Sequence, residues 1–317
     1  MKHRDNSLRI GMRSKGILIP FLLLLLIAGC GNTDQNDENN RDTTAEKKKE
    51  ANVDPTPHPS SLLASFDLKH PDTILELSDN LKEISGLATD ASGRLFGHQD
   101  EEGIIYELDP TTGKVLKRWG IGKWGLEDDF EGIAIVGDLF YLLSSEGELY
   151  EFREGDDKGV SEFKQYKTDI TGKFDAEGLC YDPKTNTLLI VCKEFPGKDY
   201  NDGEEKTVFP FSMETKELIR EPRFVLDVRT ILKKTGEKDF KPSAIELNPS
   251  SGSFFLLSSK DQAIIEVSPA GDLLAAYELD KDIHPQPEGI AFGKNGEMYI
   301  GNEKGGLVVY NSGKGKK

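Results

Sequence analysis

Phe130-Glu131-Gly132-Ile133-Ala134 is one copy of a motif that occurs five times in this chain of 317 residues. The other copies are Glu83-Ile84-Ser85-Gly86-Leu87-Ala88, Ala176-Glu177-Gly178-Leu179-Cys180, Pro242-Ser243-Ala244-Ile245 and Pro287-Glu288-Gly289-Ile290-Ala291. The shared glycine or alanine recurs after 46, 46, 66 and 45 residues. A period of about 40–50 residues is typical of four-stranded propeller blades, so five copies predict a five-bladed β-propeller.

Turns and apolar runs follow each motif in the order that a blade requires. Residues 90–93 and 293–296 are turns that end in glycine, which suits the positive φ of tight hairpins. Second strands are expected at runs such as 188–191, and third strands at runs such as 264–267. The sequence therefore predicts an all-β fold over residues 64–317. A solenoid or a two-sheet sandwich is the alternative, but a sandwich gives no reason for the period.

The last repeat ends near Tyr310, after its third strand. Residues 65–77, which precede the first motif, have no other partner, so we expect this N-terminal segment to supply the strand that closes the last blade and removes two exposed edges. The longer third step predicts an insertion of about 20 residues near 198–239, with a polar loop at 200–205 and a short helix at 228–234.

The N-terminus has the features of an export signal. A basic segment precedes an apolar run at 17–27 that is too short to span a bilayer. Leu26-Ile27-Ala28-Gly29-Cys30 resembles the lipobox of bacterial lipoproteins, in which the cysteine is acylated. We therefore expect a signal peptide at 1–29 and lipid on Cys30, followed by a disordered polar tether at 30–63. An ordinary secretory signal is the alternative.

These features predict a lipid-anchored protein of the cell envelope. Gly31 stands where an aspartate would mark inner-membrane retention, which favours the outer membrane in a Gram-negative cell. The net charge of −16 opposes binding to nucleic acid. The expected partners are the membrane, through the lipid, and an unknown small molecule or envelope protein, and the chain is expected to be a monomer. Cys180 and Cys192 are expected to be buried free thiols, with a disulfide as the alternative.

Five blocks of sequence together resemble the SdiA-regulated family of bacterial envelope proteins: residues 81–87, 130–134, 177–183, 241–245 and 284–292. The resemblance covers residues 65–311. It implies a five-bladed propeller on a membrane-associated or lipid-anchored protein, in agreement with the number of motifs, and it implies no particular chemistry.

Carboxylates recur at two equivalent positions of the repeat. In a propeller the first strand of each blade lines the channel, and its start lies on the same face as the end of the second strand. The residues before the shared glycine or alanine are Ser85, Glu131, Glu177, Ser243 and Glu288. The residues near the ends of the second strands are Asp100, Glu146, Glu194, Asp261 and Glu303. Eight of these ten residues are acidic, which predicts an acidic channel mouth.

Such a ring requires compensation, because two carboxylates about 6 Å apart repel by roughly 3 kcal/mol at an effective dielectric constant of about 20. A divalent cation, interleaved basic side chains or protonation of some acids would relieve the repulsion. Oxygen ligands without clustered histidine or cysteine favour Ca²⁺ or Mg²⁺. Alternatively, Lys193, Lys260 and Lys304 each adjoin a ring acid and could pair with it.

The sequence supports two functional hypotheses. The first is a module that binds a ligand or a protein, with a preference for cations or basic groups at the mouth. The second is a Ca²⁺-dependent hydrolase resembling the propeller lactonases or phytases. No catalytic residue is assigned. His98 and His284 could act as general bases beside a metal, or they could be surface or turn residues.

Overall fold

The structure, a computed structural model, describes residues 61–123 and 125–313. The expected signal peptide, the acylated Cys30 and nearly all of the expected tether lie outside the described residues. At the other end of the tether, Leu63 is fully buried, and its N–H donates to Glu266 Oε2 at 2.8 Å.

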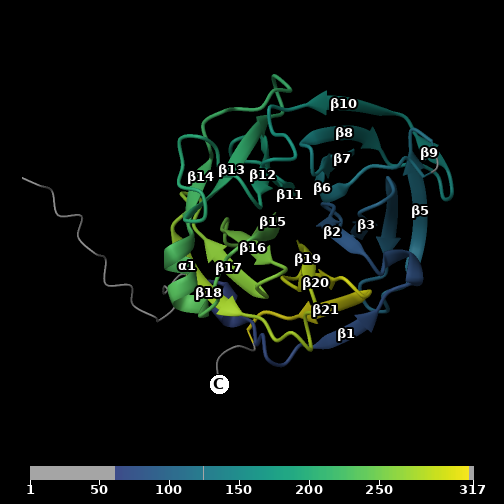
Figure 1. The fold of residues 1–317 in the computed structure, drawn as a ribbon. Helices are drawn as coiled ribbons and strands as arrows, with labels where there is room; N and C mark the ends of the chain where they lie inside the picture. The colour runs from purple at the N-terminus through teal and green to yellow at the C-terminus, as the bar shows by residue number, and fades with distance from the viewer. Residues whose placement is uncertain (1–60, 124, 314–317) are drawn as a thin grey trace, which may run out of the picture. The chain divides into compact units, whose positions relative to one another are not determined.

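Five antiparallel sheets surround a central channel, with the first strand of each sheet innermost (Figure 1). Blades 1 and 2 contain β2 (Ile84–Thr89), β3 (Leu95–Gln99), β4 (Ile104–Leu108) and β5 (Val115–Ile121), then β6 (Phe130–Val136), β7 (Leu139–Ser144), β8 (Glu148–Arg153) and β10 (Phe163–Lys167). Blades 3 and 4 contain β11 (Ala176–Asp182), β12 (Thr187–Cys192), β13 (Glu205–Ser212) and β14 (Phe224–Asp227), then β15 (Pro242–Leu247), β16 (Phe254–Ser258), β17 (Ala263–Val267) and β18 (Leu273–Glu278). The five-bladed propeller is confirmed.

Blade 5 is closed by the N-terminal strand, as predicted. It contains β19 (Pro287–Phe292), β20 (Met298–Asn302), β21 (Gly306–Tyr310) and β1 (Thr73–Glu76). β1 is antiparallel to β21, with Thr73 opposite Val309. The residues before β1 form a short 3-10 helix, η1 (Leu63–Ser65), and Leu63 and Phe66 pack into the core of blades 4 and 5. A second such helix, η2 (Asp79–Leu81), leads into blade 1.

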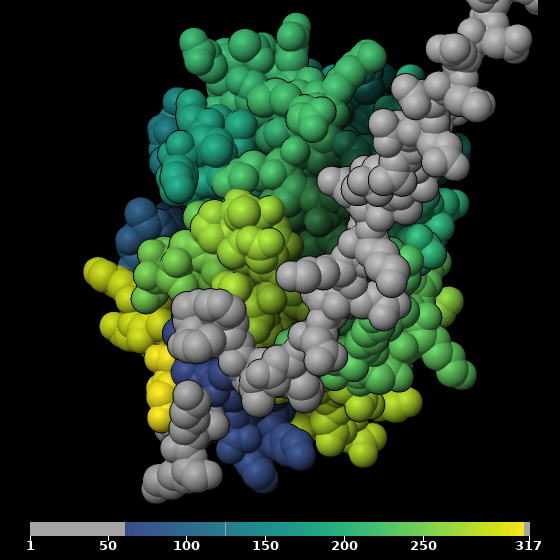
Figure 2. Space-filling model, turned by 90° about the vertical axis from the view of Figure 1, so that its left-hand side faces the viewer, coloured from purple at the N-terminus to yellow at the C-terminus, as the bar shows by residue number. Residues whose placement is uncertain are grey.

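The segment at 198–239 contains two strands of blade 3, β13 and β14, as well as additional residues. The additional residues form a long loop before β13 and the helix α1 (Val228–Thr235). Val228 and Ile231 of α1 pack into the core between blades 3 and 4. Figure 2 shows this side of the propeller, with the green edges of these blades above the purple N-terminal residues. No helix among residues 61–123 and 125–313 has the length and apolar character needed to cross a membrane.

A two-residue strand, β9 (Val160–Ser161), joins two blades. It belongs to the connection between β8 and β10 of blade 2, and it pairs in parallel with β5 at the outer edge of blade 1. The repeat contains no signal for this strand. It covers the backbone of β5, which would otherwise be an open edge.

The glycine of the motif is required where the inner strands of neighbouring blades approach each other. A Cβ atom on Gly178 would lie 2.7 Å from the backbone nitrogen of Ile245 in blade 4. A Cβ atom on Gly132 would lie 2.9 Å from the backbone nitrogen of Leu179 in blade 3. Because backbone atoms cannot move aside without shifting a strand, these positions explain why the motif has a small residue at its centre.

The two cysteines of the ring are buried free thiols, as expected. Cys180 on β11 packs in the core shared with blade 4, whereas Cys192 on β12 packs in the core shared with blade 2. The two side chains therefore lie on opposite faces of one blade, although their strands are adjacent.

Candidate functional site

A β-bulge interrupts the start of every inner strand. In β11, Ala176 pairs with Cys192 and Gly178 with Val191, so Glu177 has no partner residue in the ladder. The same register shift occurs at Ser85, Glu131, Ser243 and Glu288. A bulge changes the direction of the side chain relative to the regular alternation. It places the predicted inner residues at the channel, where Ser85, Glu131 and Glu288 contribute to the lining.

The structure brings the three inner glutamates within electrostatic reach of one another. Burial raises the pKa of Glu131, and the charge of Glu177 raises it further. Burial also raises the pKa of Glu177, although Lys193 opposes this change. Burial raises the pKa of Glu288 to about 8, with a smaller contribution from the charge of Glu131. Protonation therefore relieves part of the predicted repulsion near neutral pH.

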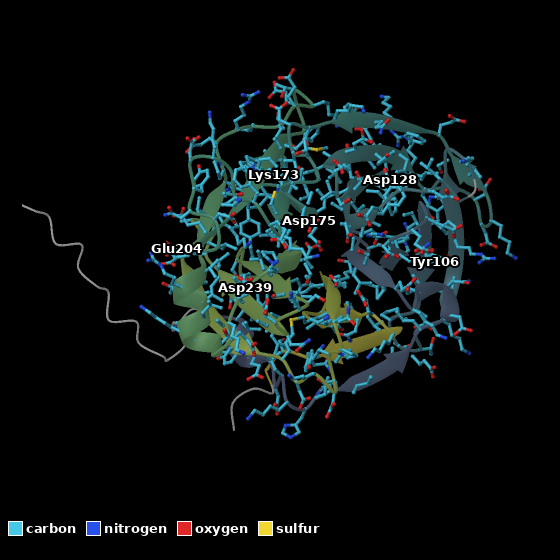
Figure 3. All side chains as sticks on the ribbon, in the orientation of Figure 1. Tyr106, Asp128, Lys173, Asp175, Glu204 and Asp239 are labelled. Carbon is cyan, nitrogen blue, oxygen red and sulfur yellow. The ribbon has the colours of Figure 1, made fainter. Side chains whose placement is uncertain are left out.

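Lys193 provides the second form of relief. Its ammonium group forms an ion pair with Glu177, which is only 2% exposed, and lies 3.8 Å from Asp175. Asp175 lies near the channel, whereas Asp128 and Tyr106 lie farther out in the ring (Figure 3). Lys193 thus pairs with an inner glutamate and not with its sequence neighbour Glu194, which forms an ion pair with Lys241.

Lys206 supports the position of Lys193. Its side chain is 2% exposed, and its ammonium group donates to the backbone oxygens of Lys193 and Glu194. Burial lowers the pKa of Lys206. Sequence reasoning did not identify Lys206, although a lysine within a strand that is otherwise apolar, as in Thr207-Val208-Phe209, is a signal for such a role. Lys260 and Lys304 are exposed and form no ion pair within the described part of the chain.

The two inner serines connect neighbouring blades. The hydroxyl of Ser85 donates to Glu131 Oε2 at 2.8 Å, between blades 1 and 2. The hydroxyl of Ser243 donates to the backbone oxygen of Pro287 at 2.8 Å, between blades 4 and 5. Only the first of these bonds involves a ring acid.

The predicted outer residues fall into two groups. Burial raises the pKa of Asp100, Asp261 and Glu303, and the charge of Asp100 also acts on Glu303. Glu146 is exposed and accepts the N–H of Gly172 at 2.8 Å, while Glu194 is held by Lys241. Glu303 is thus within electrostatic reach of Asp100 and of the inner Glu288, and Asp261 accepts the hydroxyl of Ser258 at 3.1 Å. Glu146 and Glu194 have their own local partners.

These carboxylates do not fit the expected Ca²⁺ site. Within residues 61–123 and 125–313, no three side chains of aspartate, glutamate, histidine or cysteine converge as metal ligands. Glu177 is bound to an ammonium group, and Glu131 accepts a hydroxyl. The channel beneath the mouth has a volume of only about 10 Å³. A bound group therefore has to remain at the mouth, because the channel holds at most about one water molecule.

Neither His98 nor His284 is a surface residue, so that expectation is wrong. Both are fully buried, and burial lowers the pKa of each to about 4. His98 Nδ1 lies 3.1 Å from the backbone oxygen of Gln99. His284 Nε2 lies 2.6 Å from the hydroxyl of Tyr310. These contacts make both histidines part of the core.

Five antiparallel blades around a narrow channel with an acidic mouth define the protein as a five-bladed β-propeller. The profile of the SdiA-regulated family matches residues 67–310, which include all five blades. The chain therefore belongs to the SdiA-regulated family.

Several solved structures are similar to this chain. The glutaminyl cyclase of Myxococcus xanthus has a TM-score of 0.54 and 14% identity, over 76% of this chain and 95% of that one. A luciferin-regenerating enzyme has a TM-score of 0.48 and 13% identity, over 76% and 94%. The virginiamycin B lyase of Staphylococcus aureus has a TM-score of 0.40 and 12% identity, over 74% and 68%. At these identities the similarity to the cyclase shows the fold alone.

Proposed function

We propose that this chain is an envelope lipoprotein, anchored through acylated Cys30, whose propeller binds a basic group of a ligand or a partner protein at the acidic mouth. The observation that carries the binding proposal is a pair of unsatisfied acceptors. Glu288 Oε2 and Asp100 Oδ1 are buried without a hydrogen-bond partner. Buried carboxylate oxygens without partners are costly, and such exceptions in a folded protein call for an explanation.

Charge favours a basic partner over an anionic one. Lys193 is already engaged by Glu177 and Asp175, and no metal-ligating group forms among the described residues. An incoming ammonium or guanidinium group would supply both hydrogen-bond donors and positive charge to Glu288 and Asp100. The small channel volume limits this group to the tip of a side chain or a terminal amine. The hydrolase hypothesis has no such observation in its favour.

The proposal is tested by calorimetric titration of the full chain in detergent with tetralysine and with tetraglutamate. The double variant Glu131→Gln/Glu288→Gln removes two acids of the mouth and keeps their shape. Glu214→Gln/Glu217→Gln is the matched control, because both residues are exposed in the turn between β13 and β14. We expect tetralysine affinity to fall about tenfold or more in the mouth variant alone. Equal loss in both variants, or no binding of tetralysine, contradicts the proposal.

A further inference from the structure

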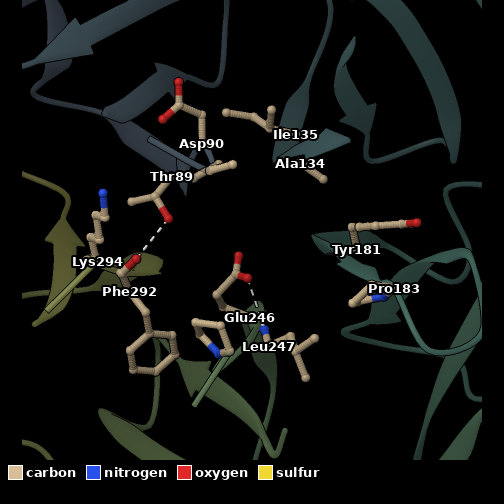
Figure 4. Close-up of a pocket in the computed structure, with 14 residues that line it drawn as sticks. Thr89, Asp90, Ala134, Ile135, Tyr181, Pro183, Glu246, Leu247, Phe292 and Lys294 are labelled. Carbon is tan, nitrogen blue, oxygen red and sulfur yellow. Dashed lines mark hydrogen bonds between the residues drawn. The ribbon is translucent and has the colours of Figure 1, made fainter. Parts of the chain in front are cut away.

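A second cavity lies at the opposite end of the channel. It has a volume of about 370 Å³ and is lined by the ends of the inner strands of all five blades. Thr89, Ile135, Tyr181, Leu247 and Phe292 represent blades 1 to 5 in its wall, which combines polar and apolar residues (Figure 4). This volume lies within the range of sites for small organic molecules.

Glu246 breaks the repeat at this cavity. It stands two residues after the shared small residue of its blade, where the other blades have Ala88, Ala134, Cys180 and Ala291. A carboxyl group thus replaces a small side chain in one blade of five. Figure 4 shows the Glu246 carboxyl group directed into the middle of the ring of lining residues.

The Glu246 carboxyl group has little local support. Its Oε1 accepts the N–H of Leu247 at 3.0 Å, which is its one hydrogen bond among the described residues. No lysine, arginine or histidine of residues 61–123 and 125–313 lies within ion-pair distance of it. Burial raises its pKa to about 8, and no neighbouring charge contributes. Glu246 is half-buried, and an acid in such a position without a cation is unusual, since charges that are removed from water are normally paired.

The other charged residues of the cavity do not serve as partners for Glu246. Asp90 is bound to Arg94 at 2.7 Å, and Lys294 is exposed at the rim. The hydroxyl of Thr89 donates to the backbone oxygen of Phe292 at 2.8 Å. Glu246 Oε2, which has no hydrogen bond among the described residues, therefore faces the cavity.

We propose that this cavity binds a small organic amine, with its ammonium group on Glu246 and its apolar body against Ile135 and Leu247. The ammonium group supplies the charge and the hydrogen-bond donor that Glu246 lacks. This site is separate from the acidic mouth and does not depend on the function proposed for that mouth.

Phenethylamine and its uncharged analogue 2-phenylethanol are suitable probes, because they share one apolar body. We expect the full chain, titrated calorimetrically at about pH 8, to bind the amine and to bind the alcohol about tenfold more weakly or not at all. Glu246→Ala introduces the residue of blades 1, 2 and 5, and we expect it to reduce amine affinity about tenfold or more. Glu246→Gln, which keeps the shape, is expected to act in the same direction.

Glu214→Gln is the control, because it removes an exposed acid from the turn between β13 and β14 and is expected to leave phenethylamine binding unchanged. Melting curves of each variant establish that it is folded. Equal affinity for the amine and the alcohol contradicts the proposal, as does unchanged affinity in folded Glu246→Gln. Absence of amine binding by the natural chain up to about 10 mM also overturns it.

Discussion

The two ends of the channel are built from the same five strands, but they carry charge in different ways. At the acidic mouth, glutamate recurs in three blades, and Lys193 and protonation compensate part of the charge. At the opposite end, four blades have a small residue at the position where blade 4 has Glu246, which forms no ion pair among the described residues. A residue that recurs among the blades follows from the geometry that they share. A residue that occurs in one blade only makes the ring asymmetric, so a ligand can be held there in one orientation.

The backbone explains part of this contrast. At the acidic mouth each inner strand starts with a bulge, so one residue per blade leaves the ladder and turns to the channel. At the other end the pairing is regular, with Glu246 opposite Phe255 and Leu247 opposite Phe254. The direction of the acids at the mouth is therefore explained by the bulge that all blades share, whereas Glu246 lies in a regularly paired strand and differs from the other blades only in residue type.

The largest effect is expected from Glu246→Ala, measured as stability against pH. The folded pKa of Glu246 is about 8, above its ordinary value of 4.5. The natural chain therefore loses stability as the pH rises from about 4.5 to about 8, because the unfolded state ionises first. The variant lacks this loss. We expect it to be more stable by on the order of 3 kcal/mol at about pH 9, allowing for the open cavity, and by little near pH 4.

Urea unfolding at several pH values measures this difference. Glu214→Ala provides the control, because Glu214 is exposed and its removal is expected to leave the pH profile unchanged. Parallel pH profiles for Glu246→Ala and the natural chain would show that the pKa of Glu246 is not raised in the folded protein. The two ends of the channel would then no longer differ in how their charge is supported.

A smaller loss of stability, about 2 kcal/mol near neutral pH, is expected from Lys193→Met. Removing one partner of a fully buried ion pair costs about 3–5 kcal/mol, and the partial exposure of Lys193 reduces this value. The loss should grow as the pH rises through the raised pKa of Glu177, because burial already raises this pKa and removal of Lys193 raises it further. Lys260→Met removes an exposed lysine and serves as the control. An equal loss in both variants would contradict the role of Lys193 as counter-charge.

Much of the fold could be predicted from the sequence because the blade is a repeated unit. The motif marked the start of every inner strand, and the missing fourth strand after Tyr310 indicated closure by β1. The extra residues in blade 3 were harder to place. Spacing alone does not say where within a 66-residue step they lie, and β13 contains Pro210, which weakens the signal of a strand. β13 and β14 were therefore included in the expected insertion.

The sequence predicts which residues lie at the site better than it predicts the side-chain contacts that these residues make. The inner residues follow from the repeat, but pairing depends on side-chain direction in three dimensions. Lys193 follows the end of β12 and reaches Glu177, although Glu194 is adjacent in sequence. His284 is buried because Tyr310 and Asn302 supply partners from distant strands. Glu246 is visible in the sequence as an acid at a position where the other four blades have small residues. Residues that the blades share do not point to it, because it occurs in one blade only.

The smallest effects are expected from two uncharged hydrogen bonds between blades, one at each end of the channel. Ser243→Ala removes the bond to the backbone oxygen of Pro287 at the acidic mouth, and Thr89→Val removes the bond to that of Phe292 at the cavity. Each should destabilise the ring by about 1 kcal/mol, the usual net value of such a bond, equally at about pH 5 and about pH 9. Urea unfolding measures both. A pH-dependent loss at either end would mean that the stability contributed by these hydroxyl groups depends on ionisation. The different pH dependence of the two ends could then not be attributed to Glu246 and Lys193 alone.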